Sequence, residues 1–231
     1  LAYSGTAANG SDFPGVATVT IAANTSSATF SIATLQDLLG EGAENLSVGI
    51  ASAAGGNFES LVVSGTNGSV TTTITDDDTP TVSVSSPSVS EGGFAVFTVS
   101  LSNASTTDVS FTPSLASGTA AVGTDTATAL EYFDGTSWQP VSGSVTIAAG
   151  NTSVQIRVAT SDDVASEGNE TFALTATVGS GNTGNASATG TATIIDDSDA
   201  VTVSLSATAN VAEGGTISYT ATLTSAAVTP M

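Results

Sequence analysis

The sequence contains no cysteine, no histidine and no lysine, and Arg157 is its only basic residue beside 21 acidic ones. The lack of thiols excludes disulfides and thiolate zinc sites. The formal charge of −20 excludes a nucleic-acid partner, because proteins bind phosphate backbones through lysine and arginine that displace counterions. The same charge argues against binding to anionic membrane surfaces.

Long apolar runs are also missing. No stretch approaches the roughly 20 apolar residues that span a bilayer, so we expect no membrane insertion. Yet 40% of the residues are hydrophobic, which is more than a chain kept disordered by its charge would carry. At 231 residues the chain can bury the core of one large domain or of two ordinary ones.

Apolar residues alternate with serine and threonine in short segments, and no segment has a convincing helical period. Alternation with period two predicts strands that are buried on one face. The predicted strands are residues 81–85, 94–101, 109–111, 145–147, 154–158, 172–178 and 188–195. We therefore expect an all-β protein built from tandem immunoglobulin-like β-sandwich domains.

The sequence also matches itself. Residues 4–7, 19–23, 40–44 and 74–77 match, in the same order, residues 117–120, 145–149, 166–170 and 194–197. These matches divide the chain into a first segment (1–80), a central segment (81–200) and a last segment (201–231). The central segment is predicted to be a whole domain. The first is predicted to lack its opening strands, and the last to hold only opening strands.

An insert after Asp125 makes the central segment longer than its counterpart. Asp134 and Gly135 are typical of a two-residue turn, so the insert is predicted to be a hairpin that ends near Trp138. The incomplete ends allow two interpretations. The chain is a piece of a long tandem array, or it assembles head to tail, so that the last segment of one molecule completes the first segment of the next.

Acidic residues gather in the repeated motifs. Only Glu59, Asp108, Glu131 and Asp134 lie outside them, whereas charges that serve solubility alone would be scattered over every strand. Four of the motifs lie just outside predicted strands, where the loops of a sandwich converge. Carboxylates within about 6 Å of one another cannot all stay ionised without a counter-charge, and the chain has almost no base to supply one.

A divalent cation is the remaining source of positive charge. Ca²⁺ accepts about six to eight oxygen ligands in adaptable geometry, while Mg²⁺ demands a tighter octahedron and keeps its waters. Zinc and copper favour the histidine and cysteine that this chain lacks. The sequence therefore predicts several bound Ca²⁺ ions. For any single acidic loop residue the alternative is an ordinary solvated position on the surface.

Five motifs follow one another in the central segment. They are Ser-Glu-Gly-Gly at 90–93, Gly-Thr-Ala at 118–120 before Asp125, Val-Thr-Ile-Ala-Ala-Gly at 145–150, the acidic stretch 162–170, and Ile-Ile-Asp-Asp at 194–197. Together they resemble the Calx-β domain, and the resemblance covers essentially the whole chain. It implies a calcium-binding β-sandwich of the kind found in sodium–calcium exchangers and in many bacterial surface proteins.

The resemblance also implies the calcium ligands. In the central segment these are Glu91, Asp125, Asp162, Asp163, Glu167, Glu170, Asp196 and Asp197, with Asp199 in place of a third closing aspartate. In the first segment they are Asp12, Asp37, Glu41, Glu44, Asp76, Asp77 and Asp78, and Glu213 would open a further site. Gln36 stands where the central segment has Asp162, so the first site is expected to bind fewer ions. Thr126 stands where the first segment has Phe13.

We expect a calcium-binding structural repeat of a large extracellular bacterial surface protein or adhesin. Residues 76–80 lead directly into the next predicted strand, and a cation held there would stiffen the junction into an extended rod. Neighbouring repeats of the same protein are the expected partners, and head-to-tail self-association into a filament or layer is an alternative.

A ligand-binding module is the second alternative. Tyr132, Phe133 and Trp138 of the insert are of the type that stacks on carbohydrate or on a cell-surface protein, although the hairpin can instead pack on its own sheet. An enzyme is not expected. The chain has no histidine base, no Gly-x-Ser-x-Gly and no phosphate-binding Gly-Lys loop.

Overall fold

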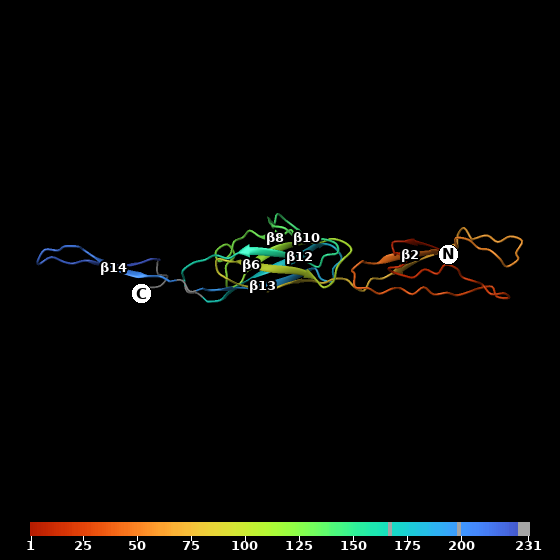
Figure 1. Ribbon diagram of the computed structural model, residues 1–231, viewed down its shortest axis with the longest axis horizontal. Coiled ribbons are helices and arrows are strands. Elements are labelled where there is room, and N and C mark those ends of the chain that lie inside the picture. The colour runs from red at the N-terminus through yellow and green to blue at the C-terminus, as the bar shows by residue number, and fades with distance from the viewer. Residues whose placement is uncertain (166–167, 198–199, 226–231) are drawn as a thin grey trace.

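The protein consists of strands and loops, with the strands in three groups along an elongated molecule (Figure 1). The structure is a computed structural model and describes residues 1–165, 168–197 and 200–225. Within these ranges there is no helix, and therefore none long and apolar enough to cross a membrane. The expected all-β fold is confirmed.

The central group is a sandwich of two five-stranded sheets. One sheet holds, in spatial order, β10 (Val145–Ile147), β7 (Val109–Ser117), β12 (Glu170–Ser180), β13 (Ser187–Ile195) and β5 (Ser88–Ser90). The other holds β4 (Val82–Val84), β6 (Phe94–Leu101), β11 (Ser153–Ala159), β8 (Glu131–Phe133) and β9 (Trp138–Pro140). Neighbouring strands are antiparallel, except that β13 and β5 are parallel.

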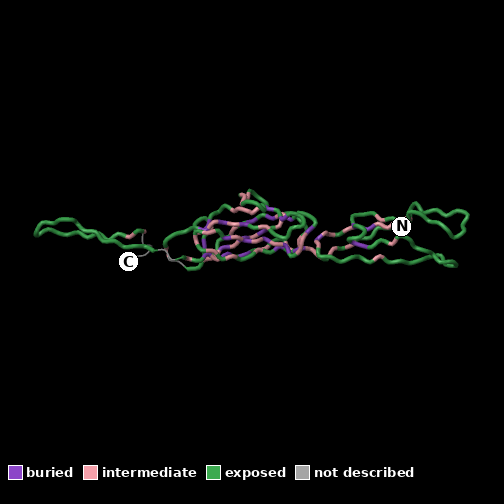
Figure 2. The backbone as a smooth tube through the Cα atoms, viewed as in Figure 1, coloured by how far each residue is buried: buried purple, intermediate pink, exposed green. Residues whose placement is uncertain are grey.

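Alternation along the strands builds the core between the two sheets. In β6 every second residue from Ala95 to Leu101 is buried. Phe97 of this sheet meets Phe172 of the other, with ring centroids 5.8 Å apart. Burying one such side chain contributes roughly 1.5–3 kcal/mol. Most of the buried residues of the molecule lie in this sandwich (Figure 2).

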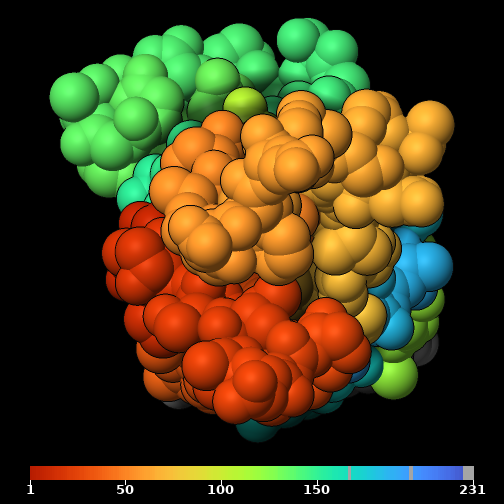
Figure 3. Space-filling view, turned by 90° about the vertical axis from the view of Figure 1, so that its right-hand side faces the viewer, coloured from red at the N-terminus to blue at the C-terminus, as the bar shows by residue number. Residues whose placement is uncertain are grey.

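The insert forms the predicted hairpin, as β8 and β9, but its turn is longer than predicted. Phe133 pairs with Trp138, so residues 134–137 make a four-residue loop instead of a two-residue turn. The Asp134 carboxylate organises this wider loop, because it accepts a hydrogen bond from the amide of Thr136 at 2.8 Å. The hairpin projects from the side of the molecule (Figures 1 and 3).

Arg157 of β11 fixes the hairpin to the sheet. Its guanidinium lies 4.1 Å from the ring centroid of Phe94 and 4.3 Å from that of Trp138. Its Nε donates to the carboxylate of Glu131 at 2.6 Å. The insert therefore packs on its own sheet through ring stacking and an ion pair.

The first group is a three-stranded antiparallel sheet in the order β1 (Ala2–Gly5), β2 (Glu44–Gly49) and β3 (Ser69–Ile74). Its core is small and consists of Ala7, Phe13 and Leu46, with partly buried neighbours. Two long connections, between β1 and β2 and between β2 and β3, form neighbouring lobes at this end of the molecule (Figure 3). Residues 19–23 are not a strand, although residues 145–147 in the matching motif form β10.

The last group is a hairpin of β14 (Val203–Ala207) and β15 (Tyr219–Leu223). It extends away from the sandwich at the end opposite the first group (Figure 1). All of β14 and most of β15 are exposed (Figure 2). The division of the chain into three repeats stays a prediction.

Candidate metal centres

The Ser-Glu-Gly-Gly motif forms the turn between β5 and β6. Gly92 has a φ of +70°, and a Cβ at this position would lie only 3.1 Å from the Cβ of Asp162. The Gly92 amide donates to the carbonyl of Ser161 at 2.8 Å, which ties the turn to the end of β11. Glycine is thus required here for both conformation and space, and it lets Glu91 and Asp162 approach each other.

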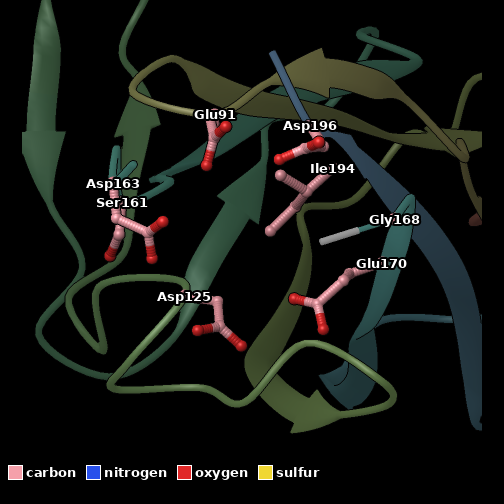
Figure 4. Close-up of a pocket in the computed structure, with 8 residues that line it drawn as sticks. All are labelled: Glu91, Asp125, Ser161, Asp163, Gly168, Glu170, Ile194 and Asp196. Atoms are coloured by element: carbon pink, nitrogen blue, oxygen red, sulfur yellow. The ribbon is translucent and has the colours of Figure 1, made fainter. Parts of the chain in front are cut away.

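Five predicted carboxylates converge on a pocket at this end of the sandwich (Figure 4). The pocket is lined by Glu91, Asp125, Ser161, Asp163, Gly168, Glu170, Ile194 and Asp196. Beside it, carboxylate oxygens of Glu91, Asp162 and Asp197 lie within 4.8 Å of one another. Glu91 also accepts a hydrogen bond from the Asp197 amide at 3.0 Å. The opening and closing motifs of the central segment therefore meet in space.

Asp125 and Asp12 are held in the same way, each by the backbone amide four residues earlier in its own loop. The amide of Ala121 donates to Asp125 Oδ2 at 2.6 Å, and the amide of Ala8 donates to Asp12 Oδ2 at 2.5 Å. The Ala8 amide is the main reason why the pKa of Asp12 lies below its ordinary value. The hydrogen bond fixes the direction of each carboxylate, and the lowered pKa keeps Asp12 charged.

A second pocket gathers the acidic residues of the first segment. It is lined by Asp12, Thr34, Leu35, Gln36, Asp37, Glu41, Gly42, Glu44, Ile74, Thr75, Asp76, Asp77 and Asp78. All seven carboxylates that the sequence predicts for this site are present. Two sets have oxygens within 4.8 Å of one another, namely Asp12 with Glu41 and Glu44, and Asp76 with Asp77 and Asp78.

Asp76 is the most firmly placed of these groups. Its Oδ2 accepts hydrogen bonds from the amides of Glu41 at 3.1 Å and Gly42 at 3.0 Å, and its Oδ1 accepts one from the amide of Asp78 at 3.1 Å. Burial raises the pKa of Asp76, but the three amides outweigh it and leave the pKa below its ordinary value. Asp76 therefore remains charged among other carboxylates.

Several neighbouring carboxylates instead have pKa values above their ordinary values. Burial, reinforced by the charge of Asp12, raises the pKa of Glu41 and of Glu44. Burial and the charge of Asp77 likewise raise the pKa of Asp78. These raised values mark carboxylates for which a counter-charge would be favourable.

In the central pocket the pKa of Glu91 is also raised, although one hydrogen bond acts to lower it. The Asp197 amide lowers the pKa of Glu91, but burial and the charges of Asp196, Asp197 and Asp163 together leave it raised.

Sequence reasoning treated Gln36 as a lost ligand, but the structure gives it a role. Its side-chain amide donates to Asp77 Oδ1 at 3.0 Å and to Asp78 Oδ2 at 2.9 Å. Gln36 stands where the central segment has Asp162, so it preserves the contact with the closing motif. The match to Asp162 could have signalled this role, because an amide offers both a donor and an oxygen ligand.

A protein-family model, the Calx-beta domain, matches residues 75–199. The chain belongs to the Calx-beta domain family. Calx-beta domains bind Ca²⁺. A second model, the LapA domain, matches residues 15–77 and 199–231, on either side of the Calx-beta match. A comparison with curated proteins gives no match.

Solved structures similar to the chain include further Calx domains. CBD12 from CALX1.2 has 19% identity and a TM-score of 0.37, with 50% of this chain and 45% of that chain covered. The apo-form Calx CBD1 domain has 20% identity and a TM-score of 0.37, with 51% and 98% covered. The PapD-like domain 7 of human CEP192 has 11% identity and a TM-score of 0.29, with 62% and 98% covered. The chain thus spans less than half of the CBD12 protein.

The residues of this Calx-beta chain suit the ion that the family binds. The side chains that line the two pockets offer carboxylate, amide and hydroxyl oxygens, the ligands that Ca²⁺ prefers. The only basic side chain, Arg157, pairs with Glu131 on the insert, so no lysine or arginine neutralises the clusters. A dication bound in these clusters would compensate for burial and mutual repulsion of the carboxylates.

One predicted ligand among the described residues is not brought together with the others. Glu213 lies on the exposed connection between β14 and β15, and no ligand group among the described residues includes it. Glu167 and Asp199 lie outside the described residues. The role of each individual carboxylate as a ligand stays a prediction.

Proposed function

We propose that this chain is a calcium-binding structural unit of a large extracellular bacterial surface protein of adhesin type, without enzymatic activity. In this proposal Ca²⁺ stiffens the junctions between consecutive sandwiches and makes an extended rod. The observation that carries the proposal is the position of the first acidic pocket. It includes Asp76, Asp77 and Asp78, directly before the short connection that leads into β4 of the central sandwich, and this connection is called the joint below.

Backbone hydrogen bonds connect the acidic loop of the first segment to the next sandwich. The Gly40 amide donates to the Ala104 carbonyl at 2.8 Å, and the Thr106 amide donates to the Gly40 carbonyl at 2.9 Å. The side-chain amide of Asn103 donates to the carbonyl of Asp78. Both loops that supply carboxylates to the first pocket are therefore held by the turn that follows β6.

The joint itself leaves little freedom. Pro80, between Asp78 and β4, is buried, and a Cβ at Gly40 would lie 2.6 Å from its Cδ. A cation bound by Glu41 and Asp78 would fix the two loops relative to each other and so hold the angle between the units. Without the cation, repulsion between the carboxylates would loosen the same contacts. Calcium near the millimolar concentrations outside cells saturates sites with Kd of about 10⁻⁴–10⁻³ M.

Thermal melting and small-angle scattering in calcium, magnesium and chelator test this proposal. We expect a higher Tm and a longer, less variable particle in calcium than in the other two solutions. The double substitution Asp77→Asn and Asp78→Asn should remove most of the change in particle length. Glu59→Gln, which also removes charge from the first segment but outside the pocket, should leave it intact. Equal Tm and equal scattering in all three solutions would overturn the proposal.

A carbohydrate- or protein-binding module is the second candidate. Phe94, which contacts Arg157 as Trp138 does, is 47% exposed and leaves an aromatic surface next to the insert. We rank this candidate lower because Trp138 already stacks on Arg157 and on Phe133, whose ring centroid is 5.4 Å away. Glycan binding that disappears in Phe94→Ala would raise it above the structural role.

A further inference from the structure

The carboxylates of the central pocket come from loops that are far apart in the sequence. Glu91 lies in the turn between β5 and β6, Asp125 in the loop before β8, and Asp163 in the loop after β11. Because like charges repel, these loops tend to separate when no ion is bound. Contacts that hold the loops together without an ion therefore favour binding, since less order has to be created when the ion arrives.

Thr160, directly after β11, holds the turn that carries Glu91. Its hydroxyl accepts a hydrogen bond from the Gly93 amide at 3.1 Å. The same hydroxyl can donate its one hydrogen to the carbonyl of Gly93 at 3.2 Å or of Ser90 at 3.3 Å. The Thr160 amide also donates to the Gly93 carbonyl at 2.9 Å. Thr160 is buried and is therefore bonded to the turn on both sides of Glu91.

Ser161 holds the loop that carries Asp125. Its hydroxyl donates to the carbonyl of Thr124, and its amide donates to the carbonyl of Asp125 at 2.9 Å. Its own carbonyl accepts the hydrogen bond from the Gly92 amide, and its side chain lines the pocket (Figure 4). The end of β11 is thus bonded to both of the loops that bring Glu91 and Asp125 to the pocket.

The first pocket repeats the backbone part of this arrangement. Leu35 stands at the position that matches Ser161, and its amide donates to the carbonyl of Asp12 at 2.8 Å, as the Ser161 amide does to that of Asp125. Leucine has no hydroxyl, so the bond to Thr124 is an addition of the central site. Removal of the Ser161 hydroxyl therefore leaves a backbone contact that the first pocket also has.

We propose that Thr160 and Ser161 are positioning residues of the central calcium site. The Thr160 hydroxyl acts through Glu91 and the Ser161 hydroxyl acts through Asp125, because each holds its loop at the end of β11 before the ion binds. This inference rests on the proposed function, since it requires the chain to bind calcium.

Calcium titration of the full chain, followed by NMR, tests the single residues. The signal of the Gly92 amide reports on the central pocket alone. Thr160→Val and Ser161→Ala each remove one hydroxyl and no charge, and each should weaken calcium binding about fivefold, the effect of one hydrogen bond. Ser161 is exposed, so Ser161→Ala leaves the core intact.

Two further variants separate positioning from general stability. Thr160→Ser keeps the hydroxyl and should restore the wild-type affinity. Thr175→Val is the matched control, because it removes a hydroxyl that pairs with that of Thr189 at 2.8 Å, between the middles of β12 and β13. It should leave the affinity unchanged.

Double-mutant cycles test which carboxylate each hydroxyl acts through. Thr160→Val should weaken binding little further in a Glu91→Gln protein, but by its full factor in an Asp125→Asn protein. Ser161→Ala should show the reverse. A residue that only stabilises the domain gives the same factor in both proteins.

Hydrogen exchange in chelator tests whether the turn is held before an ion binds. The Gly93 amide should exchange faster in Thr160→Val than in Thr160→Ser or in the wild type, because it loses an acceptor. Equal exchange in all three proteins would overturn the positioning role of Thr160.

The outcomes distinguish this inference from the proposed function. Weaker binding in both single variants, with coupling confined to the predicted pairs, supports it. Wild-type affinity in both variants, or equal factors in the two carboxylate variants, overturns the positioning roles and leaves calcium binding intact. A Gly92 signal that does not respond to calcium in the wild type overturns calcium binding at this pocket, and the inference with it.

Discussion

Arg157 and Glu131, on the neighbouring strands β11 and β8, form an ion pair with Nε and Oε2 2.6 Å apart. This pair combines the only base of the chain with one of the few acidic residues that lie outside the predicted metal motifs. The same guanidinium stacks on Phe94 and Trp138. The single positive side chain therefore holds the insert on its sheet. It is not available to neutralise the carboxylates of the acidic pockets.

Arg157→Ala should loosen the insert without unfolding the sandwich. Both partners of the ion pair are partly exposed, so the pair contributes little, and most of the loss comes from stacking. We expect about 1–2 kcal/mol of destabilisation from the two cation–π contacts. Trp138 is the only tryptophan, so its fluorescence reports the change and should shift to longer wavelength. Glu131→Gln should shift it much less. An unchanged spectrum in Arg157→Ala would contradict the described packing.

Thr126→Val should stabilise the protein. Thr126 is 1% exposed, and its hydroxyl has no hydrogen-bond partner among the described residues. Replacing an unsatisfied buried hydroxyl by a methyl group removes a desolvation cost, and we expect a gain of about 1 kcal/mol. Denaturant unfolding measures it.

Thr160→Val is the matched control for Thr126→Val. Thr160 is also buried, but its hydroxyl accepts a hydrogen bond from the Gly93 amide at 3.1 Å. Its loss should destabilise the protein by about 1 kcal/mol, because the Gly93 amide then loses this acceptor. Equal effects of the two substitutions would mean that the Thr126 hydroxyl is satisfied.

Gly92→Ala should weaken the central calcium site. The substitution places a Cβ against Asp162 at a positive φ, so both the turn and Asp162 must move. Calcium affinity, measured by titration calorimetry, should fall several-fold, with a loss of about 1 kcal/mol in stability. Gly214→Ala is the control, because Gly214 has a φ of +82° but no neighbouring atom near a Cβ. It should destabilise its own turn and leave the calcium titration of the central site unchanged.

Acidification should act in opposite directions on the calcium-free and calcium-loaded protein. Burial, with repulsion from neighbouring carboxylates, raises the pKa of Glu41, Glu44 and Asp78. The calcium-free native state therefore binds protons before the unfolded chain does. Its stability should rise as the pH falls from about 7 to about 5. Asp12 and Asp76 have lowered pKa values, so their opposite effect on stability sets in as the pH falls toward the ordinary value of 3.8.

In calcium, protons compete with the ion for the same oxygens, so the stabilisation by calcium should shrink over the same range. Melting curves in calcium and in chelator at several pH values measure both slopes. Parallel curves would show that these carboxylates do not bind the ion.

The strands were predictable where burial alternates over several residues. Residues 94–101 and 145–147 form β6 and β10 with the predicted bounds. Strand β5 was missed because Ser88–Ser90 contains a single apolar residue, Val89, and so shows no alternation. The hairpin was predicted but its loop was not, because the hydrogen bonds accepted by the Asp134 carboxylate favour a wider turn.

The carboxylates of the first pocket were predictable because their motifs recur in the central segment. Motifs that recur in the same order indicate loops of the same geometry. The bridge that Gln36 makes to Asp77 and Asp78 was not predictable from charge alone, because an amide carries none. The sequence also could not predict the backbone hydrogen bonds of Gly40 with Ala104 and Thr106. Backbone hydrogen bonds between segments do not require particular residue types.

Arg157 offers trypsin-type proteases their only cleavage point in the entire chain. It sits in the middle of β11, paired with β6 on one side and β8 on the other, under two aromatic rings. A protease of this type can cut only after the central sandwich has opened. A protein built in this way resists trypsin-type proteases for as long as that one strand stays in its sheet.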